Sequence, residues 1–120
     1  MDEVLNYMSE PVACLEGTAS AVDAAKTMAE RRISSVLVRV DGVYAGIVTR
    51  TDLVSRVLAR GLDAAATPLT EVMSSPLHSM DHYLTAGDAH EYMARHKVKH
   101  LAITREGRVV GLVTTKDLVG

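Results

Sequence analysis

Two pairs of threonine and aspartate residues have the types and the spacing to bind a small polar ligand. Thr49 and Asp52 lie three positions apart after an apolar run, and Thr114 and Asp117 repeat the arrangement. The spacing is that of a capping box, in which the threonine hydroxyl accepts from the N–H of the third helical residue. A strand that ends at a helix N-terminus also favours an anion, and the aspartate could accept from a ribose diol. Two interpretations follow: a helix cap alone, or a cap that also faces a ligand.

The elements that position these pairs occur twice in the chain. At an offset of 65 residues, fifteen of the fifty-five overlapping positions are identical, and no gap is needed. A half of this size would bury only about 60% of its surface alone. We therefore expect two pseudo-twofold-related halves packed face to face as one module, with repeat 1 over residues 1–61, a linker over 62–68 and repeat 2 over 69–120.

Local signals predict the same order of elements in each half, strand–helix–strand–strand–helix, which is an α+β pattern. Ser20-Ala-Val-Asp23 and Thr85-Ala-Gly-Asp88 are capping boxes, and Asp41-Gly42 is a hairpin signal. Gly46 and Gly111 are interpreted as turns before the strands that lead to the two Thr-x-x-Asp motifs. Strands are expected over the following segments: 12–15, 36–40, 43–48, 100–103 and 109–113.

The helices that follow the two motifs are expected to differ in length. The first runs for about ten residues, with Leu53, Val54, Val57 and Leu58 on one face, and Gly61 ends it. The second is at most a stub that stops at Leu118-Val-Gly120. The sequence fits either a natural minimal form or a piece of a longer protein.

Composition narrows the classes of function. The 120 residues carry a formal charge of −2 with both signs interspersed, and they include no Phe and no Trp, so nucleic-acid binding is disfavoured. Cys14 is the only cysteine, which excludes an intramolecular disulfide and favours a reducing compartment. The N-terminus has no signal-peptide pattern, and no apolar run is long enough for a membrane span. We expect a soluble, cytoplasmic protein.

Several motifs, in order and repeated, carry a family resemblance. They are Met-Ser-x-Pro-Val, Ala-x-x-x-Met in the first helix, Ile-Ser-Ser-Val-Leu-Val, and Asp-Gly-x-x-x-Gly-Ile-Val-Thr-x-x-Asp-Leu. From about Val4 to Val119, the chain resembles a tandem pair of cystathionine-β-synthase (CBS) domains, the Bateman module. The resemblance implies a regulatory module, not an enzyme. It would have no catalytic cofactor, and it would bind AMP, ADP, ATP, S-adenosylmethionine or NAD in clefts between the halves.

The resemblance also implies roles for individual residues. The threonines, Thr49 and Thr114, would contact phosphate or ribose, and Asp52 and Asp117 would accept from the ribose hydroxyls. Free backbone N–H groups at the helix starts would favour the phosphate. Two apolar slots would hold adenine, the first lined by Val12, Ala13, Ile33 and Val36, and the second by Leu77, His78, Val98 and Leu101.

The phosphate end is uneven. Cations are often found just before the second strand of such repeats, where this chain has Ser34-Ser35 in one half and Lys99-His100 in the other. Arg50 and Lys116, within the motifs, are further candidates. The alternative for all four charged residues is a solvated rim.

Other chemistry is poorly supported. His96 and His100 have the i, i+4 spacing of a helical metal site, but the chain is expected to leave the helix near Val98. Cys14 is interpreted as a small packed residue. No signature of a catalytic site is present.

The family resemblance also implies a homodimer, formed through the helices after the two motifs, that would regulate an enzyme, a transporter or a tethered domain. The alternatives are a module for oligomerisation alone, or a metal or redox sensor that uses Cys14 and the histidines.

Overall fold

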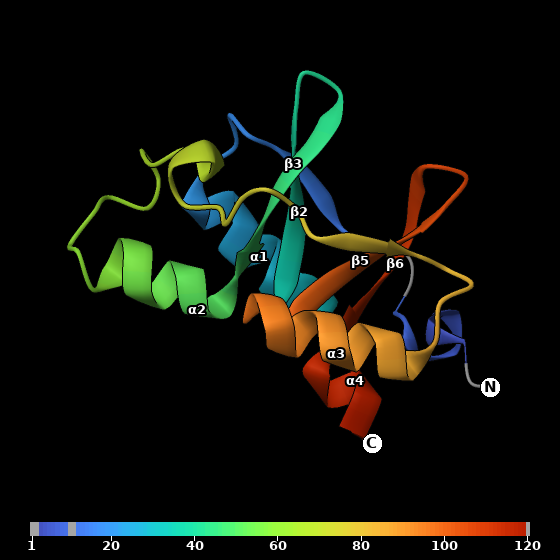
Figure 1. The fold of residues 1–120 in the computed structure, drawn as a ribbon. Helices are drawn as coiled ribbons and strands as arrows, with labels where there is room; N and C mark the ends of the chain where they lie inside the picture. The colour runs from blue at the N-terminus through green and yellow to red at the C-terminus, as the bar shows by residue number, and fades with distance from the viewer. Residues whose placement is uncertain (1–2, 10–11, 120) are drawn as a thin grey trace. The chain divides into compact units, whose positions relative to one another are not determined.

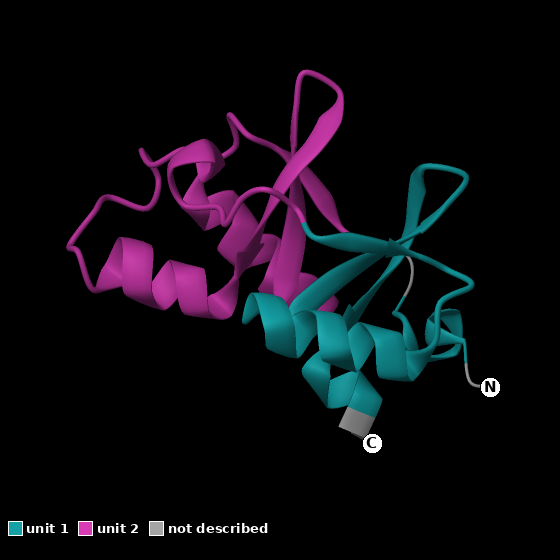
Figure 2. Cartoon of the chain, in the orientation of Figure 1, with its two compact units in different colours: residues 1–12, 78–120 teal, residues 13–77 magenta. Residues whose placement is uncertain are grey.

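The computed structural model describes residues 3–9 and 12–119, which fall into two compact units (Figures 1 and 2). Unit 2 is continuous, residues 13–77, whereas unit 1 combines residues 1–12 with residues 78–120. Each unit contains one three-stranded sheet and its own helices, which confirms the α+β class and the twofold repetition of elements. Glu10 and Pro11 of the first Met-Ser-x-Pro motif lie outside the described residues.

In unit 2, the strand order is β1-β2-β3, with β1 parallel to β2 and β2 antiparallel to β3. The elements in chain order are β1 (Cys14–Glu16), α1 (Ala21–Arg31), β2 (Ser35–Val40), β3 (Val43–Thr49), α2 (Arg50–Leu53), the π-helical η2 (Val54–Leu58) and the 3₁₀ turn η3 (Leu69–Glu71). The α2 and η2 segments form one continuous helix, as expected after Asp52, and Gly61 follows it with a φ of 67°.

Unit 1 repeats this plan. Its sheet has the order β4-β5-β6 with the same parallel and antiparallel pairings. Its elements are the 3₁₀ turn η1 (Val4–Tyr7), β4 (Ser79–Asp81), α3 (Ala86–His96), β5 (His100–Arg105), β6 (Arg108–Thr114) and α4 (Thr115–Val119). The five residues of α4 agree with the short final helix expected from the sequence.

Local chemistry explains where the long helices begin and end. The Ser20 and Thr85 side chains accept from the N–H of Asp23 and Asp88, and both capping boxes are complete. Each helix stops at a residue in the left-handed region, Arg32 in one case. The hairpin at Asp41-Gly42 also has positive φ at both central residues, as a tight turn that matches strand twist requires.

The core of each unit lies between its helices and one face of its sheet. In unit 2, the buried residues that form this core cluster are Ala13, Ala21, Ala24, Met28, Val36, Val38, Val48, Val57, Leu69 and Val72. In unit 1, the corresponding cluster is Val4, Met80, Ala89, Met93, Leu101, Ile103 and Val113. Val4 and Leu69 are equivalent by the offset of 65, and each lies in the opening segment of its repeat, before the first strand, which we call the lead-in. Each core is therefore completed by the lead-in of the other repeat.

These lead-in segments explain the repeated glycines, for which the predicted turn was wrong. Gly46 lies inside β3, where Ile47 and Ser74 exchange backbone hydrogen bonds of 3.0 and 2.9 Å. A Cβ on Gly46 would lie 2.5 Å from the Ser74 carbonyl oxygen and 2.9 Å from the Met73 sulfur. Gly111 lies inside β6 against Met8 in the same way. The glycines are required by close packing against the Met-Ser segments and not by a turn.

The segment predicted as the linker, 62–68, packs onto unit 2, because Ala21 donates to the Thr67 carbonyl and Thr67 is buried. Among the apolar positions after Asp52, Val57 is buried, whereas Val54 and Leu58 are exposed. Among the described residues, no helix has the length and apolarity to cross a membrane.

Candidate functional site

The first Thr-Asp pair lies where β3 meets α2. Thr49 is the last residue of the strand and the N-cap of the helix. Its hydroxyl accepts from the Asp52 N–H at 3.2 Å and donates to Asp52 Oδ2 at 3.1 Å. The Thr49 N–H donates to the same Oδ2 at 2.9 Å. The cap is therefore real, and it commits one oxygen of the carboxylate.

The other oxygen of Asp52 faces an arginine. Asp52 is 7% exposed, and its Oδ1 lies 3.6 Å from Nε of Arg56, one helical turn onward. Arg56 Nη1 also donates to the carbonyls of Val72 and Met73, both at 3.0 Å. The i, i+4 spacing of Asp52 and Arg56 is visible in the sequence and could have shown this ion pair.

The second pair has the same geometry at the junction of β6 and α4. Asp117 Oδ2 accepts from the Thr114 N–H at 2.8 Å and from its hydroxyl at 3.1 Å. The bond from the Asp117 N–H to the Thr114 hydroxyl is longer, 3.4 Å. Asp117 is partly exposed, in contrast to Asp52. Both copies therefore cap a helix, and Asp117 is the more accessible of the two.

The expectation of free amides at these helix starts needs correction. The Arg50 N–H donates to the Ser34 carbonyl at 3.1 Å, and the Thr115 N–H donates to the Lys99 carbonyl at 3.2 Å. The amides of Asp52 and Asp117 donate to the threonine hydroxyls. Two donors of each first turn are thus already used within the protein, which leaves less for an anion than the sequence suggested.

The structure brings the predicted cations to the second junction. His100 lies opposite Thr114 in the β5–β6 ladder, and Lys99 supplies the carbonyl that accepts from Thr115. Lys99 and Lys116 are exposed, whereas His100 is half-buried. At the first junction the residue opposite Thr49 is Ser35. Two cations are close to this junction, the exposed Arg50 and Arg56, whose Nε faces Asp52 Oδ1.

The predicted apolar slots are only partly exposed. Val36 and Leu101 are 1% and 0% exposed and belong to the two cores, so their side chains offer no surface to a ligand. Ile33 and Val98 are half-buried and pack against those cores. Ala13 is buried, and the remaining apolar members, Val12 and Leu77, are half-buried.

The compact units divide the predicted slot residues differently from the repeats of the sequence. Val12 belongs to unit 1, whereas Ile33 belongs to unit 2. Leu77 belongs to unit 2, whereas Val98 belongs to unit 1. The repeats of the sequence and the compact units of the fold therefore assign these residues differently.

A family model for the CBS domain matches residues 3–59 and again residues 69–120. The chain belongs to the CBS domain family. It is 32% identical over 118 residues to the CBS domain-containing protein YhcV of Bacillus subtilis, covering 98% of this chain and 84% of that protein. It is 30% identical to the uncharacterized protein MJ0450 of Methanocaldococcus jannaschii, covering 97% of this chain and 63% of that protein.

A solved structure has the same fold as this CBS pair. It is a proposed signal-transduction protein with CBS domains from Burkholderia ambifaria, with a TM-score of 0.88 and 26% identity. The alignment covers 98% of this chain and 90% of that one. The tandem CBS architecture expected from the sequence is thereby confirmed.

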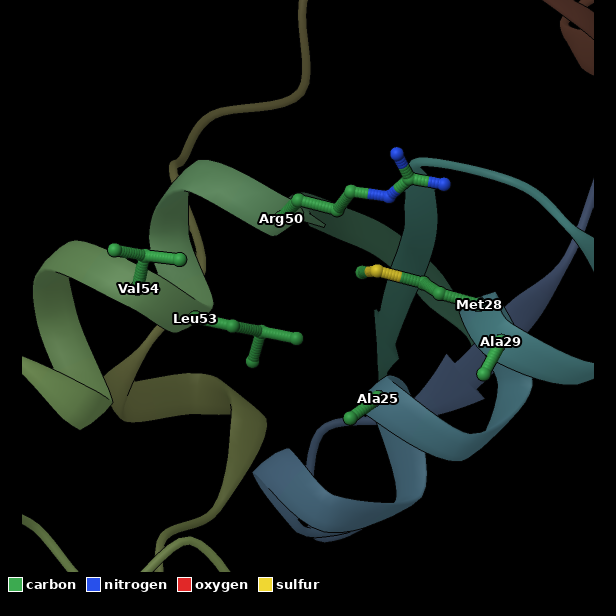
Figure 3. Close-up of a pocket in the computed structure, with 6 residues that line it drawn as sticks. All are labelled: Ala25, Met28, Ala29, Arg50, Leu53 and Val54. Atoms are coloured by element: carbon green, nitrogen blue, oxygen red, sulfur yellow. The ribbon is translucent and has the colours of Figure 1, made fainter.

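One pocket of the CBS pair lies between α1 and α2 of unit 2, with a volume of about 380 Å³ (Figure 3). Its lining residues are Ala25, Met28, Ala29, Arg50, Leu53 and Val54. Arg50 extends from α2 across the opening toward Met28. The pocket shares Arg50 with the predicted site, but its walls are otherwise apolar and contain neither Thr49 nor Asp52.

His78 is held by a cluster that sequence reasoning missed. Its Nδ1 lies 2.8 Å from the Tyr92 hydroxyl, and its ring centroid lies 5.4 Å from that of His96. The Tyr92 and His96 rings are 4.1 Å apart at their centroids. The i, i+4 spacing of Tyr92 and His96 was the available signal. His78 therefore has a fixed orientation at the start of β4.

The other candidates from the sequence were the histidine pair and Cys14, considered for metal binding or redox chemistry. The α3 helix ends at His96, before His100, so these two residues do not share a helix. Across residues 3–9 and 12–119, no three His, Cys, Asp or Glu side chains cluster closely enough to hold a metal ion. Burial raises the pKa of the half-buried Cys14 thiol, and the nearby Arg39 opposes that rise.

Proposed function

We propose that this CBS pair is a regulatory module that senses an adenosine-containing nucleotide through its two Thr-Asp junctions. The observation that carries the proposal is the use of the two carboxylates. Capping engages only Oδ2 of Asp52 and of Asp117. The second oxygen of each carboxylate, Oδ1, takes no part in the cap, and that of Asp52 lies 3.6 Å from Arg56 Nε. Each carboxylate thus keeps an acceptor for a ribose hydroxyl while it caps its helix.

The second junction is the better candidate for a phosphorylated ligand. Asp117 is more exposed than Asp52, and Lys116 precedes it in the sequence. His100 lies opposite Thr114 in the β5–β6 ladder, and the Lys99 carbonyl accepts from the Thr115 N–H. Charge-assisted hydrogen bonds from such groups are the strong ones for phosphate. We therefore propose that AMP, ADP or ATP binds the second junction more tightly than the first, with S-adenosylmethionine and NAD as further candidates of the same class.

The module would act by changing the activity of a partner protein or domain, and not by catalysis of its own. No catalytic cofactor is part of the proposal. A ligand shifts a regulatory equilibrium only if it binds one arrangement of the protein better than another. The partner would be an enzyme, a transporter or a domain on the same chain. The single, half-buried Cys14 is consistent with a reducing compartment such as the cytoplasm.

The test is a panel of ligands against variants of each carboxylate. Binding at about 100 times the dissociation constant should stabilise the fold by roughly 2.7 kcal/mol, which a thermal melt detects. Asp117→Asn should weaken AMP binding more than Asp52→Asn, because Asp117 is more exposed, whereas Asp52 is buried and its Oδ1 already faces Arg56. The Asn carbonyl oxygen can still accept from the threonine N–H of the capping box, so this substitution separates binding from folding. The 2′-deoxy form of the best ligand should bind less tightly than the ribose form.

Two results would reject the proposal. If AMP, ADP, ATP, S-adenosylmethionine and NAD all leave the melting temperature unchanged, the module does not sense these nucleotides. If a ligand binds the wild-type protein and both carboxylate variants with the same affinity, the Thr-Asp junctions are not the site. Calorimetric titration of the wild-type protein gives the stoichiometry and shows whether one or both junctions are occupied.

A second candidate function is assembly without a ligand. Val54 and Leu58 are 57% and 69% exposed on η2, and large apolar side chains with that exposure mark interaction surfaces when they occur together. We propose that this face of the helix forms a contact with a second copy, giving a homodimer. The nucleotide panel distinguishes the two functions, because assembly alone predicts association with no ligand response.

A further inference from the structure

Arg56 joins two parts of unit 2 that are distant in sequence. Its Nε faces Asp52 Oδ1 at 3.6 Å, and its Nη1 donates to the carbonyls of Val72 and Met73 at 3.0 Å. The arginine side chain is 41% exposed, whereas the aspartate side chain is 10% exposed. One guanidinium therefore connects a largely buried carboxylate to the backbone that follows η3.

The backbone that Arg56 holds is also tied to the sheet. The Ser74 N–H donates to the Ile47 carbonyl, and the Met73 N–H donates to the Leu69 carbonyl, both at 2.9 Å. The Val72 carbonyl shares its peptide plane with the Met73 N–H, and the Met73 carbonyl shares its plane with the Ser74 N–H. A movement of the Arg56 guanidinium would therefore affect two peptide groups, Val72–Met73 and Met73–Ser74. Their N–H groups make the hydrogen bonds that hold this segment in place.

The carboxylate side of the link is equally restricted. Oδ2 of Asp52 is committed to the cap by two bonds from Thr49. A ribose hydroxyl would therefore have to use Oδ1, the oxygen that faces Arg56. The guanidinium is a rigid plane, so a displacement at Nε also moves Nη1. Ligand and segment would thus both act on a single side chain.

We propose that Arg56 couples the state of Asp52 to the segment Val72–Ser74, which leads to the end of unit 2 at Leu77. Neutralising Asp52, or contacting its Oδ1, weakens the hold of Arg56 on the two carbonyls. The ligand-dependent part of this proposal rests on the proposed function above, because it needs a nucleotide at Asp52. The link between the carboxylate and the segment does not.

The test is a double-mutant cycle read at two amides, Met73 and Ser74. Amide hydrogen exchange is measured by NMR for wild type, Asp52→Asn, Arg56→Gln and the double variant. Each single change should speed exchange at both amides by about two- to five-fold, the range expected for a partly exposed ion pair. The double variant should show no more than the larger single effect, because both changes break one link.

Unit 1 supplies an internal control. The Ser9 N–H donates to the Leu112 carbonyl at 2.8 Å, which is the bond equivalent to that of Ser74 with Ile47. Arg56 does not act on this bond under the proposal, so exchange at Ser9 should be unchanged in all four proteins. If Arg56→Gln does not fold, Arg56→Lys replaces it, because a Lys ammonium lacks the two separate nitrogens, Nε and Nη1, with which Arg56 faces the carboxylate and the carbonyls.

Two outcomes of the cycle would overturn the coupling. The first is an Asp52→Asn variant in which the amides of Met73 and Ser74 exchange at the wild-type rate. The second is a double variant whose exchange rate rises by the product of the two single-variant factors. The ligand part is tested with AMP. It should alter exchange at these amides in wild type but not in Arg56→Gln, while calorimetry shows binding to both. If AMP fails to bind wild type, the proposed function fails for AMP, and the cycle still decides the coupling.

Discussion

Substituting Gly46 by alanine tests the packing of the Met-Ser segment on β3. The new Cβ would lie 2.5 Å from the Ser74 carbonyl oxygen, which belongs to the backbone and cannot rotate away. Relief requires a retreat of roughly half an ångström. That movement would stretch the bond from the Ile47 N–H, now 3.0 Å, to the edge of the hydrogen-bonding range.

The expected cost follows from these two effects. Overpacking a tight site costs about 1–3 kcal/mol. Replacing glycine also stiffens the unfolded chain, which returns about 0.4–1 kcal/mol. Gly46→Ala should therefore lower the free energy of unfolding by about 1–2 kcal/mol, equivalent to a fall of roughly 4–8 °C in melting temperature for a chain of this size.

The assay is urea unfolding followed by circular dichroism, with two matched controls. Gly87→Ala should raise the midpoint, because its Cβ meets only the Thr85 hydroxyl at 3.6 Å and alanine favours a helix by about 0.5–1 kcal/mol. Gly111→Ala should cost less than Gly46→Ala, since the atoms it meets belong to the flexible Met8 side chain. A midpoint for Gly46→Ala at or above wild type, with the Gly87 control behaving as expected, would refute the packing argument.

Three further predictions concern a helix cap, a helix face and a thiol. The backbone N–H and hydroxyl of Ser20 lower the pKa of Asp23, so its contribution to stability is present above its unfolded pKa and is lost as pH falls through the folded value. Asp23→Asn should flatten the acid side of a plot of urea midpoint against pH, and an unchanged slope would contradict this. Leu58→Glu should lower the molar mass measured by light scattering if η2 forms the contact between copies, with the exposed Ser55→Glu as the control; equal masses would exclude this face. Because burial raises the pKa of the Cys14 thiol, Cys14 should react with a disulfide reagent more slowly in the folded protein than in urea, and equal rates would argue against that environment.

Much of the fold was predictable because its signals are local. The capping boxes at Ser20 and Thr85, the hairpin at Asp41-Gly42 and the caps at Thr49 and Thr114 all depend on residues within four positions of one another. The offset of 65 then showed that one plan is used twice. These features needed no knowledge of the tertiary structure.

The errors arose where a residue's role is set by a distant segment. Gly46 reads as a turn by itself, and only Met73 and Ser74 show why a side chain is excluded there. The burial of Val36 is likewise set by the core around it, which includes Leu69 and Val72 from far along the chain. Arg56 belongs to an unremarkable helical stretch, and its bonds to Val72 and Met73 span sixteen and seventeen residues. Pattern reasoning has no access to such distances.

The exchange of lead-in segments also bears on the order in which the protein can form during synthesis. Unit 2 is one continuous stretch, 13–77, so all of its core is available once Leu77 has been made. Unit 1 needs both Val4 and Val113, which are more than one hundred residues apart. The segment that carries Val4 must therefore wait, with its apolar side chain unburied, until β6 has been translated. A ribosome-bound chain would pass through a state in which unit 2 can be complete while Val4 has not yet met its partners.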